Sequence, residues 1–196
     1  MARITPPELV VIGTSLGGLN ALIAVLGSLP PSIAVPLCVV QHRSPDIAGQ
    51  GLATLLQEHT RLTVIEAEDK MPLSPGTVFL APADYHLLVE ERGRLALSTE
   101  GPVRAARPAI DVLFETAAEA YGPAVLGVLL TGASADGAEG IATLKRRGAR
   151  VIVQDPESAE SPTMPAAGIA AASVDYVVAL GDIGRYVTSM VEGTRV

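Results

Sequence analysis

The chain has 196 residues, of which 48% are apolar, and its 14 basic and 21 acidic side chains give a net charge of −7. This length suits one well-buried domain, and the acidic balance argues against nucleic acid as a partner, because phosphate binding requires clustered Lys and Arg. With no Trp, four Tyr and two Phe, the core must be aliphatic, which is typical of parallel strands covered by helices on both faces.

Residues 9–41 contain no charged side chain, but Pro30, Pro31 and Pro36 and paired glycines interrupt them. No stretch reaches the roughly 18 unbroken apolar residues of a membrane span, and the first residues do not resemble a signal peptide. We therefore predict a buried strand–helix–strand unit without membrane insertion. The single cysteine, Cys38, lies in an apolar run, so we expect a buried, inert thiol and a cytoplasmic protein.

Apolar runs typical of strands alternate with helical patterns along the chain. The expected strands lie at about 9–13, 36–41, 62–66, 77–81, 124–131, 150–154 and 176–180, and the expected helices at 18–28, 46–59, 109–121, 137–147, 164–172 and 182–192. This alternation predicts an α/β fold, with a doubly wound, mostly parallel, Rossmann-like sheet and helices on both faces. No linker divides the chain, so we expect a single domain over residues 1–196.

The pattern changes near residues 85–99. Two short apolar stretches, 85–90 and 95–98, flank Gly93, which can supply the positive φ of a tight turn. We predict one antiparallel hairpin there.

The first predicted strand stops at Gly13, and Ser15 follows before Gly17 and Gly18 open a helix. In a parallel sheet this point lies at the carboxyl edge, where such folds bind ligands. Ser15 is therefore either a nucleophile or a polar residue of a phosphate-binding turn. A dinucleotide site is disfavoured because the glycine spacing misses G-x-G-x-x-G and the second strand ends in Gln41 rather than an acidic residue.

Two further reactive side chains follow predicted strands. His42 comes directly after the run that ends at Gln41, and Asp136 lies in the loop after the most apolar strand. If the strands are parallel, Ser15, His42 and Asp136 share one edge and can serve as nucleophile, base and orienting carboxylate. Taken singly, His42 could be a solvated loop residue and Asp136 a helix N-cap.

The other histidines carry less information. We expect His59 to be solvated at a helix end, whereas His86, at the start of the hairpin, either packs locally or lines the cleft. No Cys, His or carboxylate spacing indicates a metal site, and we predict no cofactor.

Several segments, taken in fixed order, resemble the catalytic domain of CheB-type chemotaxis protein-glutamate methylesterases over essentially the full length. The matching segments are 11–18, 40–42, 66–69, 75–82, 84–86, 107–114, 127–132, 136–137 and 164–165. The resemblance implies that Ser15, His42 and Asp136 are the catalytic residues. It also implies that the backbone N–H groups of Leu16 and Ala133 form the oxyanion hole.

The chain departs from the family pattern at a few positions. Leu16 replaces a common Thr, Ala133 replaces a Met, Ser134 replaces a Gly, and Ala106 replaces a His. A backbone role survives these changes, although substrate fit could differ.

The resemblance implies hydrolysis of glutamate γ-methyl esters on the helical bundles of chemoreceptors, with deamidation of receptor glutamine as a second activity. The rim of the cleft is expected at Arg43, the Asp84–His86 turn and the Ser161–Pro165 loop, with Met164 contacting substrate. The family's receiver domain is absent from this chain, so we expect activity that does not respond to phosphodonors. A non-catalytic binding module on the same fold remains the alternative.

Overall fold

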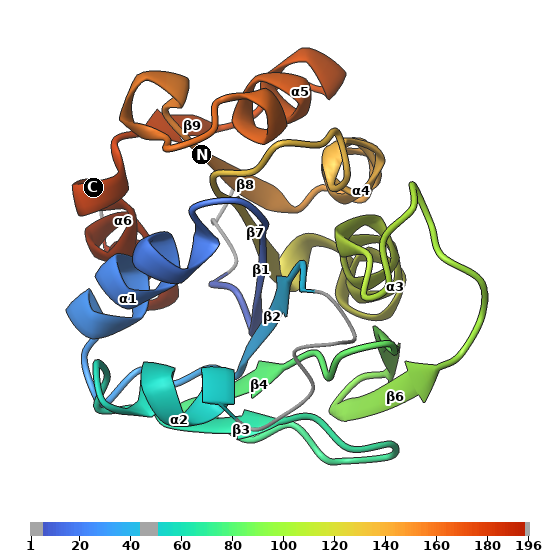
Figure 1. Ribbon diagram of the computed structural model, residues 1–196. Coiled ribbons are helices and arrows are strands. Elements are labelled where there is room, and N and C mark those ends of the chain that lie inside the picture. Colours follow the sequence, from blue (N-terminus) through green and yellow to red (C-terminus); the bar gives the residue numbers. More distant parts are fainter. Residues whose placement is uncertain (1–5, 44–50, 195–196) are drawn as a thin grey trace.

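The computed structural model describes residues 6–43 and 51–194. A parallel sheet of seven strands lies at its centre, in the order β3-β4-β2-β1-β7-β8-β9 (Figure 1). The strands are β1 (Leu9–Thr14), β2 (Leu37–Gln41), β3 (Thr63–Glu66), β4 (Thr77–Leu80), β7 (Val125–Leu129), β8 (Arg150–Gln154) and β9 (Tyr176–Val178). All seven predicted strands are present, and the predicted parallel sheet is confirmed.

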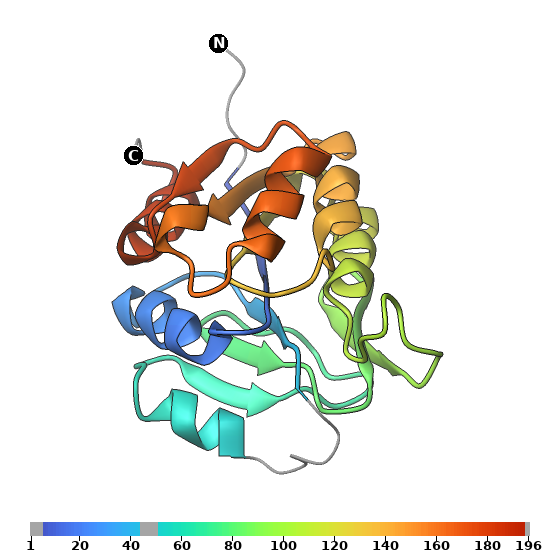
Figure 2. The same cartoon turned by 45° about the horizontal axis from the view of Figure 1, so that its top comes forward.

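Helices cover both faces of this sheet, as predicted. On one face lie α1 (Gly18–Ser28), α2 (Gly51–Gln57) and α6 (Ile183–Val191), and on the other lie α3 (Ile110–Tyr121), α4 (Ala138–Arg146) and α5 (Thr163–Ala171) (Figures 1 and 2). Short 3₁₀ turns are η2 (Gly122–Ala124), η3 (Pro156–Ser158) and η4 (Leu180–Asp182). Of the predicted helix 46–59, residues 46–50 lie outside the described part of the chain.

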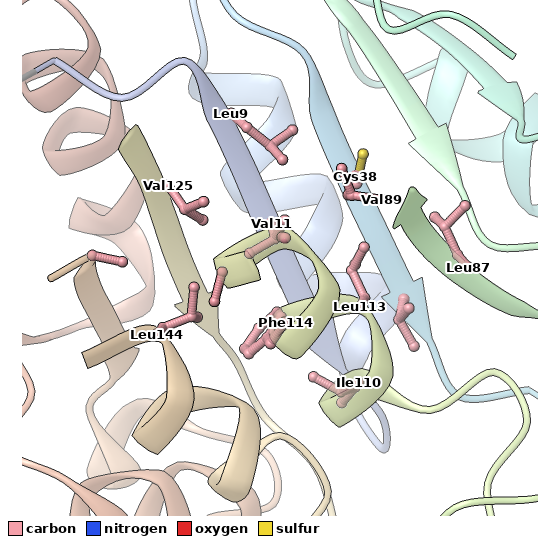
Figure 3. Close-up of a cluster of buried hydrophobic side chains, with 14 of the residues drawn as sticks. Leu9, Val11, Cys38, Leu87, Val89, Ile110, Leu113, Phe114, Val125 and Leu144 are labelled. Atoms are coloured by element: carbon pink, nitrogen blue, oxygen red, sulfur yellow. The ribbon is translucent and has the colours of Figure 1, made fainter. Parts of the chain in front are cut away.

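Alternating side chains of the strands build two separate cores. In β1, Leu9 and Val11 pack with Phe114 of α3 (Figure 3), whereas Val10 and Ile12 pack with the α1 side of the sheet. Burial on both faces is why the strand reads as a continuous apolar run. No helix in the described ranges is long and apolar enough to span a membrane.

The predicted hairpin is present as β5 (His86–Glu91) and β6 (Arg94–Ser98), and Gly93 has the expected positive φ of 87°. It forms a sheet of its own rather than an extension of the central one. Leu87 and Val89 of the hairpin pack beside Leu113 of α3 (Figure 3), so the hairpin steadies the outer side of that helix.

Strand order brings three loops together. β1 pairs in parallel with β2 on one side and with β7 on the other. The chain leaves β1 in one direction and returns to its other side at β7, and such a switch point opens a crevice at the carboxyl ends of the strands. Ser15, His42 and Asp136 all follow these three adjacent strands.

Candidate active site

The turn that carries Ser15 is fixed by its backbone. The Ser15 N–H donates to the Thr131 carbonyl (3.0 Å), and the Ser15 carbonyl accepts from the Gly18 N–H (2.9 Å) and from the Gln41 side-chain amide (2.8 Å). Gly17 takes a left-handed φ of 78°, which L side chains rarely adopt. Ser15 itself remains partly exposed, so its hydroxyl can meet a substrate.

His42 and Asp136 form a direct pair across neighbouring loops. His42 Nε2 lies 2.6 Å from Asp136 Oδ2, and the exposed fractions of the two side chains are 17% and 0%. An ionised carboxylate can accept a hydrogen bond but cannot donate one, so Nε2 must carry the ring proton in this contact. The lone pair on Nδ1 is then left to act as a base. This contact holds the His42 ring in one orientation, and the catalytic role of the pair stays a prediction.

Backbone N–H groups surround the Asp136 carboxylate. Oδ2 also accepts from the Ile110 N–H (2.7 Å), while Oδ1 accepts from the N–H groups of Asp111 and Gly137 (3.0 Å each). Burial alone would raise the pKa of Asp136, but the hydrogen bonds from His42, Ile110 and Asp111 outweigh it and hold this pKa below its ordinary value. The carboxylate is therefore ionised at neutral pH.

Asp136 does act on a helix terminus, but not on the one that its sequence position indicates. The helix that follows it, α4, has Gly137 at its N-cap with no side-chain cap. Asp136 instead accepts the first N–H groups of α3, which begins 26 residues earlier in the sequence at Ile110. The N-cap alternative for α4 is therefore wrong.

Ser15 and His42 line the same cleft, which has a volume of about 490 Å³. Its other described lining residues are Leu16, Gly17, Gly18, Leu19, Asn20, Gln41 and Glu160. A second cavity of about 400 Å³ is also lined by His42. In the described residues no hydrogen bond joins Ser15 to His42, and such contacts often tighten only when substrate binds.

Two backbone N–H groups predicted to bind the oxyanion lie in exposed turns. Leu16 is 57% exposed, and Ala133 is exposed as well. Within residues 6–43 and 51–194, neither N–H donates to another protein group. Gly132, just before Ala133, is anchored because its N–H donates to the Ser161 carbonyl (3.1 Å). The oxyanion hole itself stays a prediction.

The structure places part of the predicted rim at the cavities. Arg43 and Asp84 both line the second cavity beside His42. His86, by contrast, is only 2% exposed: its Nδ1 accepts from the Ala109 N–H (3.2 Å) and its Nε2 donates to the Gly101 carbonyl (3.1 Å). Of the two alternatives for His86, local packing is the one observed, and its place on the rim is wrong.

The Ser161–Pro165 loop is also placed differently from the prediction. Met164 is 0% exposed and Ser161 is 8% exposed. Met164 lies on the inward face of α5, so close to Gly132 that a Cβ there would come within 2.6 Å of its Cε. The residue of this loop that faces the cleft is Glu160, one position before the predicted segment.

Two other sequence predictions concern single side chains. Cys38 is fully buried, and burial raises the pKa of its thiol far above the ordinary value, as expected of an inert cysteine. His59 is exposed, also as expected.

Two polar residues near Ser15 escaped the sequence interpretation. Gln41 holds the Ser15 carbonyl, and Thr131 Oγ1 donates to the Leu16 carbonyl (2.9 Å) while accepting from the Ser161 N–H (2.8 Å). Both follow the pattern of the other site residues, since each stands at the carboxyl end of a central strand. Among the described residues, no three His, Cys, Asp or Glu side chains gather as metal ligands would.

Comparisons with known proteins match this chain to one family over almost its whole length. A family model described as CheB methylesterase matches residues 10–187. A putative protein-glutamate methylesterase/protein-glutamine glutaminase of Leptospira interrogans is 42% identical over 178 residues, which is 91% of this chain and 92% of that protein. Protein-glutamate methylesterase/protein-glutamine glutaminase 4 of Myxococcus xanthus is also 42% identical, over 97% of this chain but 54% of that protein.

A solved structure gives the same result. The crystal structure of the Thermotoga maritima CheB methylesterase catalytic domain superposes with a TM-score of 0.89 at 34% identity, covering 95% of this chain and 100% of that one. The resemblance stated from the sequence motifs is thereby confirmed.

Proposed function

The chain belongs to the CheB methylesterase family, and we propose that it hydrolyses glutamate γ-methyl esters on bacterial chemoreceptors with Ser15, His42 and Asp136 as its triad. The observation that carries the residue assignment is the 2.6 Å contact between His42 Nε2 and Asp136 Oδ2. It leaves one basic ring nitrogen on a histidine that shares a cleft with Ser15. An oriented base beside a hydroxyl is what nucleophilic catalysis by serine requires.

In the first half of the reaction, Ser15 Oγ attacks the γ-carbonyl carbon of the ester while His42 Nδ1 takes the hydroxyl proton. Asp136 stabilises the imidazolium and does not itself become protonated. The negative charge that develops on the carbonyl oxygen would be met by the N–H groups of Leu16 and Ala133. When the intermediate collapses, the C–O bond to the methoxy group breaks, and His42 protonates the departing oxygen to give methanol.

In the second half, water attacks the acyl-enzyme and gives a proton to His42. That proton returns to Ser15 Oγ as the ester bond to the enzyme breaks. The glutamic acid side chain left on the receptor then releases its own proton to solvent and becomes a carboxylate. An amide substrate follows the same steps with ammonia as the leaving group. Deamidation of receptor glutamine is accordingly the second activity that we propose, in line with the glutaminase named in the Leptospira interrogans relative.

The surface around the cleft fits a substrate side chain that projects from an intact helix. Leu16 and Leu19 line the cleft and are 57% and 36% exposed, and Tyr85, beside the second cavity's Asp84, is 41% exposed. Exposed apolar side chains of this kind mark interaction surfaces when they cluster near a site. We propose that they contact the helical bundle of the receptor.

The remaining parts of the proposal concern organisation and place. Residues 1–196 would form a single catalytic domain, acting on the cytoplasmic segments of receptors without entering the membrane. No bound cofactor takes part in the steps above.

Release of methanol from methylated receptors tests the proposal. Membranes carrying receptors with radiolabelled methyl esters are incubated with the purified protein, and volatile label is counted. The wild-type protein should release methanol, Ser15→Ala should release none, and Ser32→Ala, at an exposed position away from the cleft, should match the wild type. Wild-type release by Ser15→Ala would show that the nucleophile is misassigned, and no release by any of the three would favour a non-catalytic module.

A further inference from the structure

Glu160 places a carboxylate in the cleft that contains Ser15. Of the described residues lining that cleft, it alone is acidic. The Glu160 side chain lies against Gly17: a Cβ built on Gly17 would be 2.6 Å from Glu160 Cβ and 2.9 Å from Oε2. Asn20 Nδ2, in the first turn of α1, is 3.5 Å from the same oxygen. The carboxylate therefore sits over the turn that begins at Ser15.

The charge of Glu160 is not offset by a cation in the described part of the chain. Its side chain accepts one hydrogen bond there, from the neutral Asn20 amide. The two arginines beside His42, in the second cavity, already have acidic partners: Arg43 pairs with Glu66 (2.5 Å) and Arg107 with Asp84 (2.6 Å). Of the two cavities that His42 lines, the one that contains Ser15 therefore holds an acidic side chain with no cationic partner among the described residues.

The charge of Glu160 affects the substrate and the product of the proposed reaction differently. The ester substrate is neutral at its side-chain end, whereas the product is a carboxylate. Two like charges in one exposed cleft repel each other, although solvent weakens the effect. We infer that Glu160 is a specificity-determining residue that excludes carboxylates from the cleft, so that unmethylated glutamate, whether product or neighbouring receptor site, competes poorly with the methyl ester. The inference rests on the proposed function.

A purely structural role for Glu160 makes a different prediction. An acidic group near the N-terminus of α1 stabilises a helix dipole, and α1 has no side-chain cap of its own. In that case removal of the charge would lower the stability of the protein without changing which molecules reach Ser15.

A pair of sulfonyl fluorides separates these readings without any receptor. Benzenesulfonyl fluoride is neutral and 4-carboxybenzenesulfonyl fluoride is anionic. Each forms a bond from Ser15 Oγ to sulfur as the S–F bond breaks, with loss of fluoride and transfer of the hydroxyl proton to His42. Labelling rates are measured by mass spectrometry of the intact protein and of the peptide that contains Ser15.

The variants are Glu160→Gln and, as a charge-matched control, Glu157→Gln. Glu157 is exposed in η3 and does not line the cleft. We expect Glu160→Gln to raise the ratio of anionic to neutral labelling about threefold or more, an effect of the size that one nearby charge exerts through partly solvated protein. Glu157→Gln should leave the ratio unchanged, and added salt should raise the ratio in the wild type by screening Glu160.

Three other outcomes would overturn the inference, and each would point to a different explanation. An unchanged ratio in Glu160→Gln, with Ser15 labelled by both probes, would refute the exclusion of carboxylates and leave the proposed function standing. The same unchanged ratio with a lowered melting temperature would assign Glu160 to the α1 terminus. Absence of Ser15 labelling in the wild type would contradict the proposed function and the inference with it.

Discussion

His42 Nε2 lies 2.6 Å from Asp136 Oδ2, and this contact decides which ring nitrogen is available to Ser15. With Nε2 committed to the carboxylate, only Nδ1 can take a proton from a hydroxyl in the cleft. Asp136 in turn accepts the Ile110 N–H on the same oxygen (2.7 Å). The base is therefore positioned through one carboxylate that is itself held by the backbone.

Asp136→Asn should impair both activity and stability. An amide can offer an oxygen to only one of the two sides that Asp136 now serves, so its NH₂ group must face either His42 or a backbone N–H. We expect kcat to fall by about 10⁴-fold, as when a triad carboxylate is replaced and the imidazole tautomer changes. Methanol release by the purified variant measures the loss, and a kcat within tenfold of wild type would contradict the orienting role.

The stabilising effect of Asp136 should depend on pH. Its pKa is lowered in the folded state, so the ionised group contributes stability that is fully present above its unfolded value of about 3.9 and is lost as the pH falls through the folded value. The free energy of unfolding of wild type minus that of Asp136→Asn should therefore be constant above about pH 5 and shrink below about pH 4. Urea unfolding at pH 7 and pH 3 measures it, and a difference independent of pH would refute the shift.

Gly18→Ala should disturb the Ser15 turn through Gln41. A Cβ at Gly18 would come within 2.2 Å of Gln41 Oε1 and 2.6 Å of Thr14 Oγ1, so Gln41 must move and release the Ser15 carbonyl. We expect a stability loss of about 1–3 kcal/mol from overpacking and a fall in kcat of up to about 10², as for an ångström-scale misplacement. Gly181→Ala, which adds a methyl group in open space, is the control and should behave as wild type.

Met164→Ala should lower stability rather than weaken substrate binding directly. The side chain is fully buried against Gly132, and its truncation leaves a cavity that costs about 2–5 kcal/mol. Thr163→Ala, at the exposed neighbouring position, should cost little. Thermal and urea unfolding provide the measurement. A raised KM with unchanged stability would restore Met164 to the rim that its sequence position indicated.

The central sheet and the meeting of Ser15, His42 and Asp136 could be predicted because each depends on a local pattern. An apolar run of β-branched residues gives a strand, and parallel strands bring their ends to one edge. An amphipathic helix also shows its buried face in its sequence, but α5 has small and apolar residues on every side and shows no such pattern. The rotation of α5 about its axis decides that Met164 faces inward, and the path of the preceding loop decides that Glu160 faces the cleft.

The hydrogen-bond donors to the Asp136 carboxylate could not be predicted from the sequence either. Its carboxylate accepts from the start of α3, and nothing in residues 136–137 indicates which helix end will arrive there. Packing of α3 against α4 and the hairpin places the start of α3 beside the Asp136 carboxylate. The nearest helix in the sequence, α4, was the natural but wrong expectation.

The donors that hold Asp136 are main-chain groups of Ile110, Asp111 and Gly137. Every amino acid except proline supplies the same N–H, so the bonds from positions 110 and 111 do not depend on the side chain. Gly137 is different, because its φ is 94° and an added Cβ would lie 2.7 Å from Leu129 Cδ1. The side chains that line the cleft around His42 can therefore change during evolution, while the backbone hydrogen bonds that hold the Asp136 carboxylate are kept as long as the fold is kept. For an engineer who wishes to change the substrate, position 110 is limited by packing in the core. Position 111 is limited by the hydrogen bond that Asp111 accepts from the Gly140 N–H (2.8 Å) and by its ion pair with Arg104 (3.0 Å).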